Sequence, residues 1–239
     1  MDLTDSVAVV TGASSGLGTH FSKSLIDRGA TVYGLARSAD KLADVQDTLG
    51  EAFRPLTCDL RDEDDVADTF DAIRDESDRL DVLINNAGLG QFGPVDELPL
   101  EDWDVQMDTN LRGVFLCARE VVPTMREQND ESGFGGHIVN VASIAGLLGN
   151  PNLTAYNASK FGVRGFSESL MKEVRDDGIR VTCLYPGSTD TNFFDVAGVD
   201  MTDNPLAPED VAATAMHVLE SPANHLISEV VLRPLRPRG

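Results

Sequence analysis

Short apolar, β-branched runs alternate with segments of helical period along the whole chain, and this alternation constrains the fold more than any other feature. Seven runs are predicted as strands, at residues 7–10, 31–35, 56–58, 82–84, 137–141, 181–184 and 226–232. Strands that are separated by helices pair in parallel through right-handed crossovers. Because the runs are apolar on both faces, helices must cover both sides of the resulting sheet.

Six helices are predicted between the strands, at residues 18–28, 41–49, 63–77, 100–128, 155–176 and 208–219. Asp62 and Pro208 favour helix starts, and Pro123 is expected to kink or shorten the fourth helix. Loops are predicted at 132–136 and 186–205. The sequence therefore predicts an α/β fold in which residues 1–239 form a single Rossmann-type, doubly wound domain with a seven-stranded parallel sheet flanked by helices.

The first predicted strand runs directly into a glycine-rich turn that opens a helix, Thr11-Gly12-Ala13-Ser14-Ser15-Gly16-Leu17-Gly18. Gly12 permits the tight turn, Gly16 lets the backbone approach a pyrophosphate, and Gly18 allows the helix to pack closely on the strand. The helix N-terminus adds free N–H groups and a positive dipole. This order of strand, turn and helix predicts a dinucleotide site, with an ordinary surface loop as the alternative.

The end of the second predicted strand carries Arg37, where an NAD-binding fold usually has an acidic residue for the ribose 2′-hydroxyl. A guanidinium can hold a 2′-phosphate through paired charged hydrogen bonds, so NADP is favoured over NAD. In the alternative interpretation, Arg37 is a solvated surface residue and Asp40 turns back to the ribose.

Tyr156 and Lys160 are four residues apart in a segment of helical period, so both side chains lie on one face of the helix. A phenol with a free pKa of about 10 is a poor acid or base at neutral pH, but a nearby ammonium lowers that pKa. Taken alone, the pair would describe an exposed tyrosine beside a surface lysine. Taken with the glycine turn, it predicts a proton-transfer pair.

Other motifs join this pair. They are Asn85-Asn86-Ala87-Gly88 after the fourth strand, Asn110, Ser143 after the fifth strand, and Pro186-Gly187 after the sixth. Together with the glycine turn, they resemble the short-chain dehydrogenase/reductase family over nearly the whole chain. The resemblance implies an enzyme that moves a hydride between NADP, or less favourably NAD, and a small-molecule carbonyl or secondary alcohol.

The resemblance also implies catalytic roles. Tyr156 would be the general acid in reduction, and Ser143 would hydrogen-bond the substrate oxygen. Lys160 would bind the nicotinamide ribose and lower the pKa of Tyr156, and Asn110 would hold a water that relays protons from Lys160. This agrees with the chemistry, because a developing alkoxide needs a nearby donor and a proton while the cofactor supplies the hydride.

The cofactor contacts follow from the same resemblance, with Asp59 at the adenine and Asn86 at the adenine ribose. The expected set is Gly12, Ser14, Ser15, Gly16, Leu17, Gly18, Arg37, Asp59, Leu60, Asn86, Ala87, Gly88, Tyr156, Lys160, Pro186, Gly187, Thr189 and Thr191. Asp59 could instead cap the next helix, and Asn86 could instead stabilise the sheet edge through backbone bonds.

Residues 186–205 are expected to form the substrate loop. Its candidate lid residues are Phe193, Phe194, Val196, Val199 and Met201, and further candidates for pocket walls are Leu89, Phe92, Ile144 and Leu148, with core packing as the alternative. Residues 227–234 lack the glycine-rich ending that is common in acyl-carrier-protein ketoreductases. The chain therefore looks closer to broad-specificity NADP-dependent members that act on 3-hydroxy acids or small ketones.

Charge excludes one class of partner. With 40 acidic and 19 basic residues, a formal net charge of −21 argues against nucleic acid, which requires clustered Lys and Arg. An aspartate-rich surface with few lysines resembles that of proteins from salt-loving organisms, so a halophilic habitat is expected. No stretch reaches the roughly 20 apolar residues that span a bilayer, and the start lacks a signal-peptide pattern. We expect a cytoplasmic protein without membrane partners.

Cysteine and histidine spacing predicts no metal. Cys58, Cys117 and Cys183 lie far apart in apolar segments and are expected in the core, and the four histidines show no ligand spacing. A homo-oligomer, either a tetramer or a dimer, is expected through the fourth and fifth helices. Apolar positions compatible with such an interface are Leu111, Val114, Phe115, Ala118 and Val122.

Three other functions are alternatives to this interpretation. A non-catalytic NADP-binding sensor would use the same fold, but intact Ser143, Tyr156 and Lys160 argue against it. A 3-oxoacyl-acyl-carrier-protein reductase is the alternative within the enzyme class. A sugar-nucleotide epimerase or dehydratase of the extended branch resembles longer chains with a different glycine spacing.

Overall fold

Seven parallel strands form one sheet in the computed structural model, which describes residues 1–191, 193, 203–222 and 224–236. The strands are β1 (Val7–Thr11), β2 (Thr31–Ala36), β3 (Phe53–Thr57), β4 (Val82–Asn85), β5 (Gly136–Val141), β6 (Ile179–Pro186) and β7 (Glu229–Leu232). They are ordered β3-β2-β1-β4-β5-β6-β7, and every neighbouring pair is parallel. This confirms the predicted doubly wound sheet.

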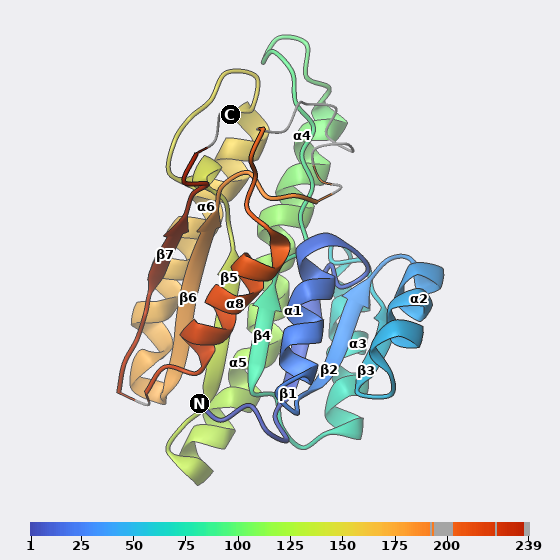
Figure 1. The fold of residues 1–239 in the computed structure, drawn as a ribbon, viewed down its shortest axis with the longest axis vertical. Helices are drawn as coiled ribbons and strands as arrows, with labels where there is room; N and C mark the ends of the chain where they lie inside the picture. The colour runs from blue at the N-terminus through green and yellow to red at the C-terminus, as the bar shows by residue number, and fades with distance from the viewer. Residues whose placement is uncertain (192, 194–202, 223, 237–239) are drawn as a thin grey trace.

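Helices cover both faces of the sheet. They are α1 (Gly16–Ile26), α2 (Ala39–Leu49), α3 (Glu63–Glu76), α4 (Leu100–Met107), α5 (Gly113–Ser132), α6 (Thr154–Val174) and α8 (Pro208–Leu219). In Figure 1, α1 and α8 lie in front of the sheet and α5 and α6 lie behind it. As expected, the Asp62 side chain caps α3 and Pro208 begins α8.

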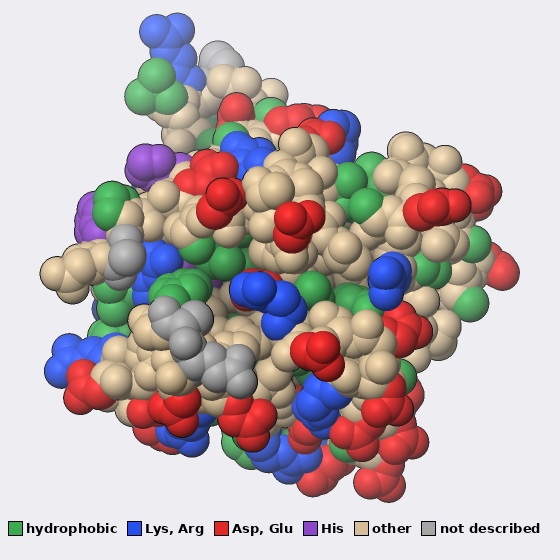
Figure 2. All heavy atoms as spheres, turned by 90° about the horizontal axis from the view of Figure 1, so that it is seen from below, with side chains coloured by type: hydrophobic (Ala, Val, Ile, Leu, Met, Phe, Trp, Pro, Cys, Tyr) green, Lys and Arg blue, Asp and Glu red, His purple; other side chains and the backbone are tan. Residues whose placement is uncertain are grey.

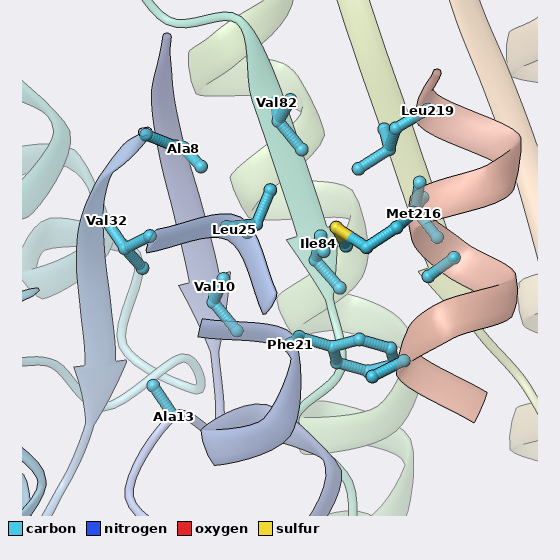
Figure 3. Close-up of a cluster of buried hydrophobic side chains, with 14 of the residues drawn as sticks. Ala8, Val10, Ala13, Phe21, Leu25, Val32, Val82, Ile84, Met216 and Leu219 are labelled. Atoms are coloured by element: carbon cyan, nitrogen blue, oxygen red, sulfur yellow. The ribbon is translucent and has the colours of Figure 1, made fainter. Parts of the chain in front are cut away.

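Alternate residues of the strands supply two separate cores, because successive side chains in a strand point to opposite faces. Val10 joins Phe21 of α1 and Met216 of α8 in one buried cluster, which Figure 3 shows. Its neighbour Val9 joins Phe70 of α3 and other residues of α5 and α6 in the second cluster. A strand that is buried on both sides explains the continuous apolar runs of the sequence.

The predicted fourth helix is interrupted by a π-helical turn, Asp108–Arg112, between α4 and α5. There the N–H of Gly113 bonds to the carbonyl of Asp108, five residues back. Pro123 does not shorten the helix, since α5 continues to Ser132 and ends where Gly133 takes a left-handed φ of 75°. The loop predicted at 132–136 is therefore wrong at both ends, because Ser132 closes α5 and Gly136 opens β5.

The two edge strands differ from their predicted bounds. β3 begins three residues earlier and ends before Cys58; it contains Pro55, which an edge strand tolerates. β7 spans only Glu229–Leu232, not the predicted 226–232. The carbonyl of Ile227 accepts a bond from the Thr182 side chain instead of a strand partner (2.6 Å).

The described residues contain three buried, free cysteines, Cys58, Cys117 and Cys183, which confirms their place in the core. Within the same residues, no helix is long and apolar enough to cross a membrane, and no group of His, Cys, Asp and Glu side chains could hold a metal ion.

Candidate active site

The site lies where the strand order reverses, between β1 and β4, outside the carboxyl ends of the strands. Loops that follow β1, β2, β4, β5 and β6 line one cavity of about 690 Å³ there. Doubly wound sheets bind ligands at this switch point, because neighbouring loops diverge and leave a crevice.

The glycine turn adopts a conformation that its glycines permit. Gly12 and Gly16 have positive φ values of 67° and 53°. A Cβ at Gly12 would lie 2.9 Å from the Cα of Ala87, and a Cβ at Gly18 would lie 2.1 Å from the Gly12 carbonyl oxygen. Gly18 therefore packs α1 against the turn and does not line the cavity, and α1 begins at Gly16, two residues earlier than predicted.

The N-terminus of α1 fits an anionic pyrophosphate. Its N-cap residue, Ser15, makes no side-chain capping bond, and its first turn holds no acidic residue. Ser14, Gly16 and Leu17 line the cavity at this turn, where the first N–H groups of a helix lack intrahelical partners. Thr191 forms the opposite wall, 3.5 Å from where a Cβ of Gly16 would stand.

The end of the cavity beside β2 and α2 carries positive charge. Arg37 at the end of β2 and Lys41 in the first turns of α2 both line it, whereas Asp40 does not. The interpretation in which Asp40 serves the ribose is therefore not favoured. Lys41 was not among the expected cofactor residues, although a second cation four residues after Arg37 indicates a site for an anion.

Asp59 lines the cavity but is already paired. Its carboxylate accepts bonds from Arg61 Nε (2.9 Å) and Nη2 (2.5 Å), and these hydrogen bonds lower the pKa of Asp59. Asp59 does not cap α3, a role that Asp62 fills.

Asn86 both supports the sheet and lines the cavity. Its side-chain amide donates to the Thr11 carbonyl (3.0 Å), and its backbone N–H donates to the Thr11 hydroxyl (3.0 Å). The remaining expected cofactor residues, Leu60, Ala87, Gly88, Pro186, Gly187 and Thr189, also line the cavity.

Tyr156 lies in the cavity wall at the other end from Arg37, with only 7% of its surface exposed. Burial raises the pKa of its phenol to about 12, and a hydrogen bond with the Ser143 side chain acts in the opposite direction. Ser143 is itself oriented by the N–H of Ala145, which donates to its hydroxyl (3.1 Å). Lys160 is not among the causes of this shift, so the expected lowering of the Tyr156 pKa by its ammonium is absent in this structure.

Lys160 lies one helical turn beyond Tyr156 and is 3% exposed. Its Nζ donates to the carbonyl of Val141 (3.1 Å) and lies 5.8 Å from the centre of the Tyr156 ring. Burial lowers the pKa of Lys160 to about 8. The cation thus faces the ring, and its charge does not act directly on the phenolic oxygen.

Asn110 sits in the π-helical turn and is fully buried, so it supports the cavity and does not line it. Its side-chain amide donates to the Leu89 carbonyl (2.8 Å) and to the Ser159 hydroxyl (3.0 Å), while its oxygen accepts from the N–H of Leu89 (2.8 Å). A Cβ at Gly88 would lie 3.3 Å from both Asn110 Oδ1 and Lys160 Nζ. Asn110 therefore fastens the loop after β4 to α6 beside the lysine.

The expected substrate residues divide into three groups. Leu89, Phe92, Ile144 and Phe193 line the cavity. Leu148 is 52% exposed and does not line it. The remaining lid candidates, Phe194, Val196, Val199 and Met201, lie outside the described residues. Asn150 and Leu153 also line the cavity, and no motif in the sequence marks them.

The fold and the site define a class of protein. It is an α/β protein in which one cavity holds a glycine-rich turn suited to a dinucleotide and, at its other end, the side chains of Ser143, Tyr156 and Lys160. The family described as short chain dehydrogenase matches residues 6–200, and the chain belongs to this family of oxidoreductases.

Similar proteins extend over the whole chain. An uncharacterized oxidoreductase of Staphylococcus saprophyticus is 32% identical over 98% of this chain and 100% of its own length. The closed form of serine dehydrogenase complexed with NADP⁺ is 29% identical with a TM-score of 0.87, covering 96% of this chain and 95% of that one. A 3-ketoacyl-(acyl-carrier-protein) reductase from Brucella melitensis complexed with NADH is 27% identical with a TM-score of 0.89, covering 98% and 99%.

Proposed function

We propose that the protein is an NADP-dependent dehydrogenase/reductase that transfers a hydride between the nicotinamide and a carbonyl or secondary alcohol. One observation carries this proposal. The buried Tyr156, the hydroxyl of Ser143 and the ammonium of Lys160 line the same cavity as the open N-terminus of α1. A cofactor bound with its pyrophosphate at α1 would bring its nicotinamide toward this set.

The chain's own groups would handle the proton. The bound cofactor supplies or accepts the hydride. Because burial keeps Tyr156 protonated at neutral pH, its hydroxyl is ready to donate to a substrate oxygen in the direction of reduction. Ser143 would donate a hydrogen bond to the same oxygen as negative charge develops on it.

Lys160 is suited to resupply that proton. With a pKa of about 8, it can both hold and release a proton near neutral pH. It would also contact the nicotinamide ribose. Asn110 would hold a water that relays protons from Lys160, and its side chain fixes the loop beside the lysine.

The preference for NADP rests on two cations. Arg37 and Lys41 line the end of the cavity that would receive the adenosine ribose. Two positive side chains favour a 2′-phosphate over a free hydroxyl, and a guanidinium can bind it with two hydrogen bonds. The serine dehydrogenase with NADP⁺ supports this preference, while the NADH complex of the reductase shows that the shared fold accepts either cofactor.

We further propose a cytoplasmic homo-oligomer, a tetramer or a dimer, with residues 186–205 as the substrate loop of a single domain 1–239. Of the expected interface residues, Val114, Ala118 and Val122 are buried within the monomer, but Phe115 of α5 is 45% exposed. Phe161 of α6 is 42% exposed as well. Exposed aromatic side chains on two long helices favour a contact between copies at α5 and α6.

A saline habitat is the accompanying proposal. Carboxylates spread over the face shown in Figure 2, with Lys and Arg among them, and the formal net charge is −21. Exposed ion pairs such as Arg119 with Glu63 contribute little, because water and salt screen them, so they leave most of the repulsion in place. Salt would screen that repulsion.

The function is tested by following absorbance of NADPH with ketones, β-keto esters, acyl thioesters and sugars. Oxidation of NADPH with a ketone or keto ester is the expected result. Turnover of acyl thioesters alone would indicate the acyl-carrier-protein reductase. Saturable binding of NADPH without any turnover would indicate the sensor and would overturn the proposal.

A further inference from the structure

Three aromatic rings from separate segments lie next to one another, and one of them is the ring of Tyr156. Phe92 comes from the loop between β4 and α4, Phe193 from the segment after β6, and Tyr156 from α6. The ring centre of Tyr156 lies 5.6 Å from that of Phe92 and 5.6 Å from that of Phe193. The two phenylalanine rings are 6.4 Å apart. Both phenylalanines line the cavity, so they form its wall beside the reacting group.

Because residue 90 is a glycine, the rings of Phe92 and Phe193 pack directly against its backbone. A Cβ at this position would stand 2.6 Å from the Phe92 ring and 3.1 Å from the Phe193 ring. No side chain at residue 90 can therefore separate the rings or offer a polar group between them. The aromatic part of the wall beside Tyr156 is apolar, and the polar lining residues Ser143 and Asn150 are neutral.

One cation lies close to this wall, because Lys160 Nζ is 5.8 Å from the centre of the Tyr156 ring. Among the described lining residues, the cations are Arg37, Lys41 and Lys160. β2, which ends beside Arg37, is three strand positions from β5, or about 14 Å at a spacing of about 4.8 Å. The ammonium of Lys160 is engaged, since it donates to the Val141 carbonyl, and under the proposed function it would contact the nicotinamide ribose.

We infer that Phe92 and Phe193 are specificity-determining residues that admit uncharged carbonyl substrates with an apolar or aryl group and exclude substrates that carry a carboxylate. A carboxylate beside these rings would lose water, and the nearby Lys160 ammonium already donates to the Val141 carbonyl and would contact the nicotinamide ribose. An aryl or alkyl group would instead gain apolar contact. This inference rests on the proposed function and departs from the 3-hydroxy acids that the sequence favoured.

Two substrate pairs test the inference. Acetoacetamide and acetoacetate have nearly the same shape and differ in charge, so we expect kcat/KM with NADPH to be at least about 100-fold higher for the amide. Ethyl benzoylacetate carries an aryl group that ethyl acetoacetate lacks. Phe92→Ala and Phe193→Ala should each lower kcat/KM for the aryl ester by about 10- to 100-fold.

Matched variants separate specificity from stability and cofactor binding. Leu100→Ala removes an apolar side chain that is 73% exposed and outside the cavity, and it should leave kcat/KM unchanged. Phe92→Arg and Phe193→Arg place a cation in the wall. At least one of them should raise the ratio of kcat/KM for acetoacetate to that for acetoacetamide more than 10-fold. A fluorescence titration with NADPH should give each alanine variant the dissociation constant of the wild type.

The outcomes distinguish this inference from the proposed function. If NADPH is consumed but acetoacetate reacts as well as acetoacetamide, the inference fails and the oxidoreductase remains. Alanine variants that keep the wild-type kcat/KM for ethyl benzoylacetate would also overturn it. If no carbonyl compound consumes NADPH, the proposed function fails and the inference fails with it.

Discussion

Acid should destabilise the protein through one buried imidazole, that of His137 in β5. The side chain is fully buried, and its Nε2 lies 2.8 Å from the hydroxyl of Thr182. That hydroxyl donates to the carbonyl of Ile227 (2.6 Å), so it must accept from an Nε2–H group. Nδ1 then carries the lone pair and has no hydrogen-bond partner in the described structure. A second proton on the ring would therefore be buried without an acceptor.

The size and sign of the effect follow from the shifted pKa. Burial lowers the pKa of His137 to about 3, and the nearby charge of Arg180 contributes in the same direction. An unfolded chain has the ordinary value of about 6.5. Between these values the unfolded state binds a proton that the folded state does not, so stability is complete above pH 6.5 and falls as the pH decreases. At about 1.4 kcal/mol per pH unit, the loss from pH 8 to pH 5 is about 2 kcal/mol.

Urea unfolding at fixed salt and protein concentration, at several pH values from 8 to 5, measures this loss. His137→Gln keeps an N–H donor for Thr182 but cannot titrate, so its free energy of unfolding should fall by about 2 kcal/mol less than that of the wild type. His217→Gln, at an exposed position of α8, is the matched control and should follow the wild type. Equal acid slopes for wild type and His137→Gln would refute the reasoning.

Three further predictions concern the cofactor site and the surface. Arg37→Ala should lower the ratio of kcat/KM for NADPH to that for NADH by about 30- to 100-fold, whereas Asp40→Asn should not; an unchanged ratio for Arg37→Ala would contradict the NADP assignment. Gly18→Ala should weaken NADPH binding at least about 10-fold in a fluorescence titration, because its Cβ would collide with the Gly12 carbonyl, while Gly149→Ala meets nothing within 4 Å and should bind normally. The Tm should rise from dilute buffer to molar KCl; a Tm that ignores salt would rule out the halophile proposal.

The seven-stranded parallel sheet could be predicted because buried strands and amphipathic helices leave different periods in the sequence. The π-helical turn could not be predicted, since one extra residue in a turn barely disturbs a helical pattern. The predicted end of this helix at residue 128 is four residues too early. Gly133, whose left-handed φ ends α5, was the better stop signal. The edge strands were misplaced because their pairing depends on one neighbour only.

In the site, spacing predicted which side chains meet but not the burial and the pKa shift of each one. Tyr156 and Lys160 do share a helix face, yet the direction of the phenol's pKa shift depends on burial and on the bond from Lys160 to the Val141 carbonyl. Similarly, Gly18 and Asn110 carry family motifs but act behind the cavity wall. The meeting of Phe92 with Phe193 depends on two loops whose paths no local pattern specifies.

Turnover and cofactor affinity of Tyr156→Phe, measured on the same preparation, test the central proposal most directly. The substitution removes only the phenolic oxygen, so the dissociation constant for NADPH should stay within about twofold of the wild type, while kcat with a keto ester should fall about 1000-fold. A variant that still turns over at a rate near that of the wild type would contradict the assignment of Tyr156 as the proton donor.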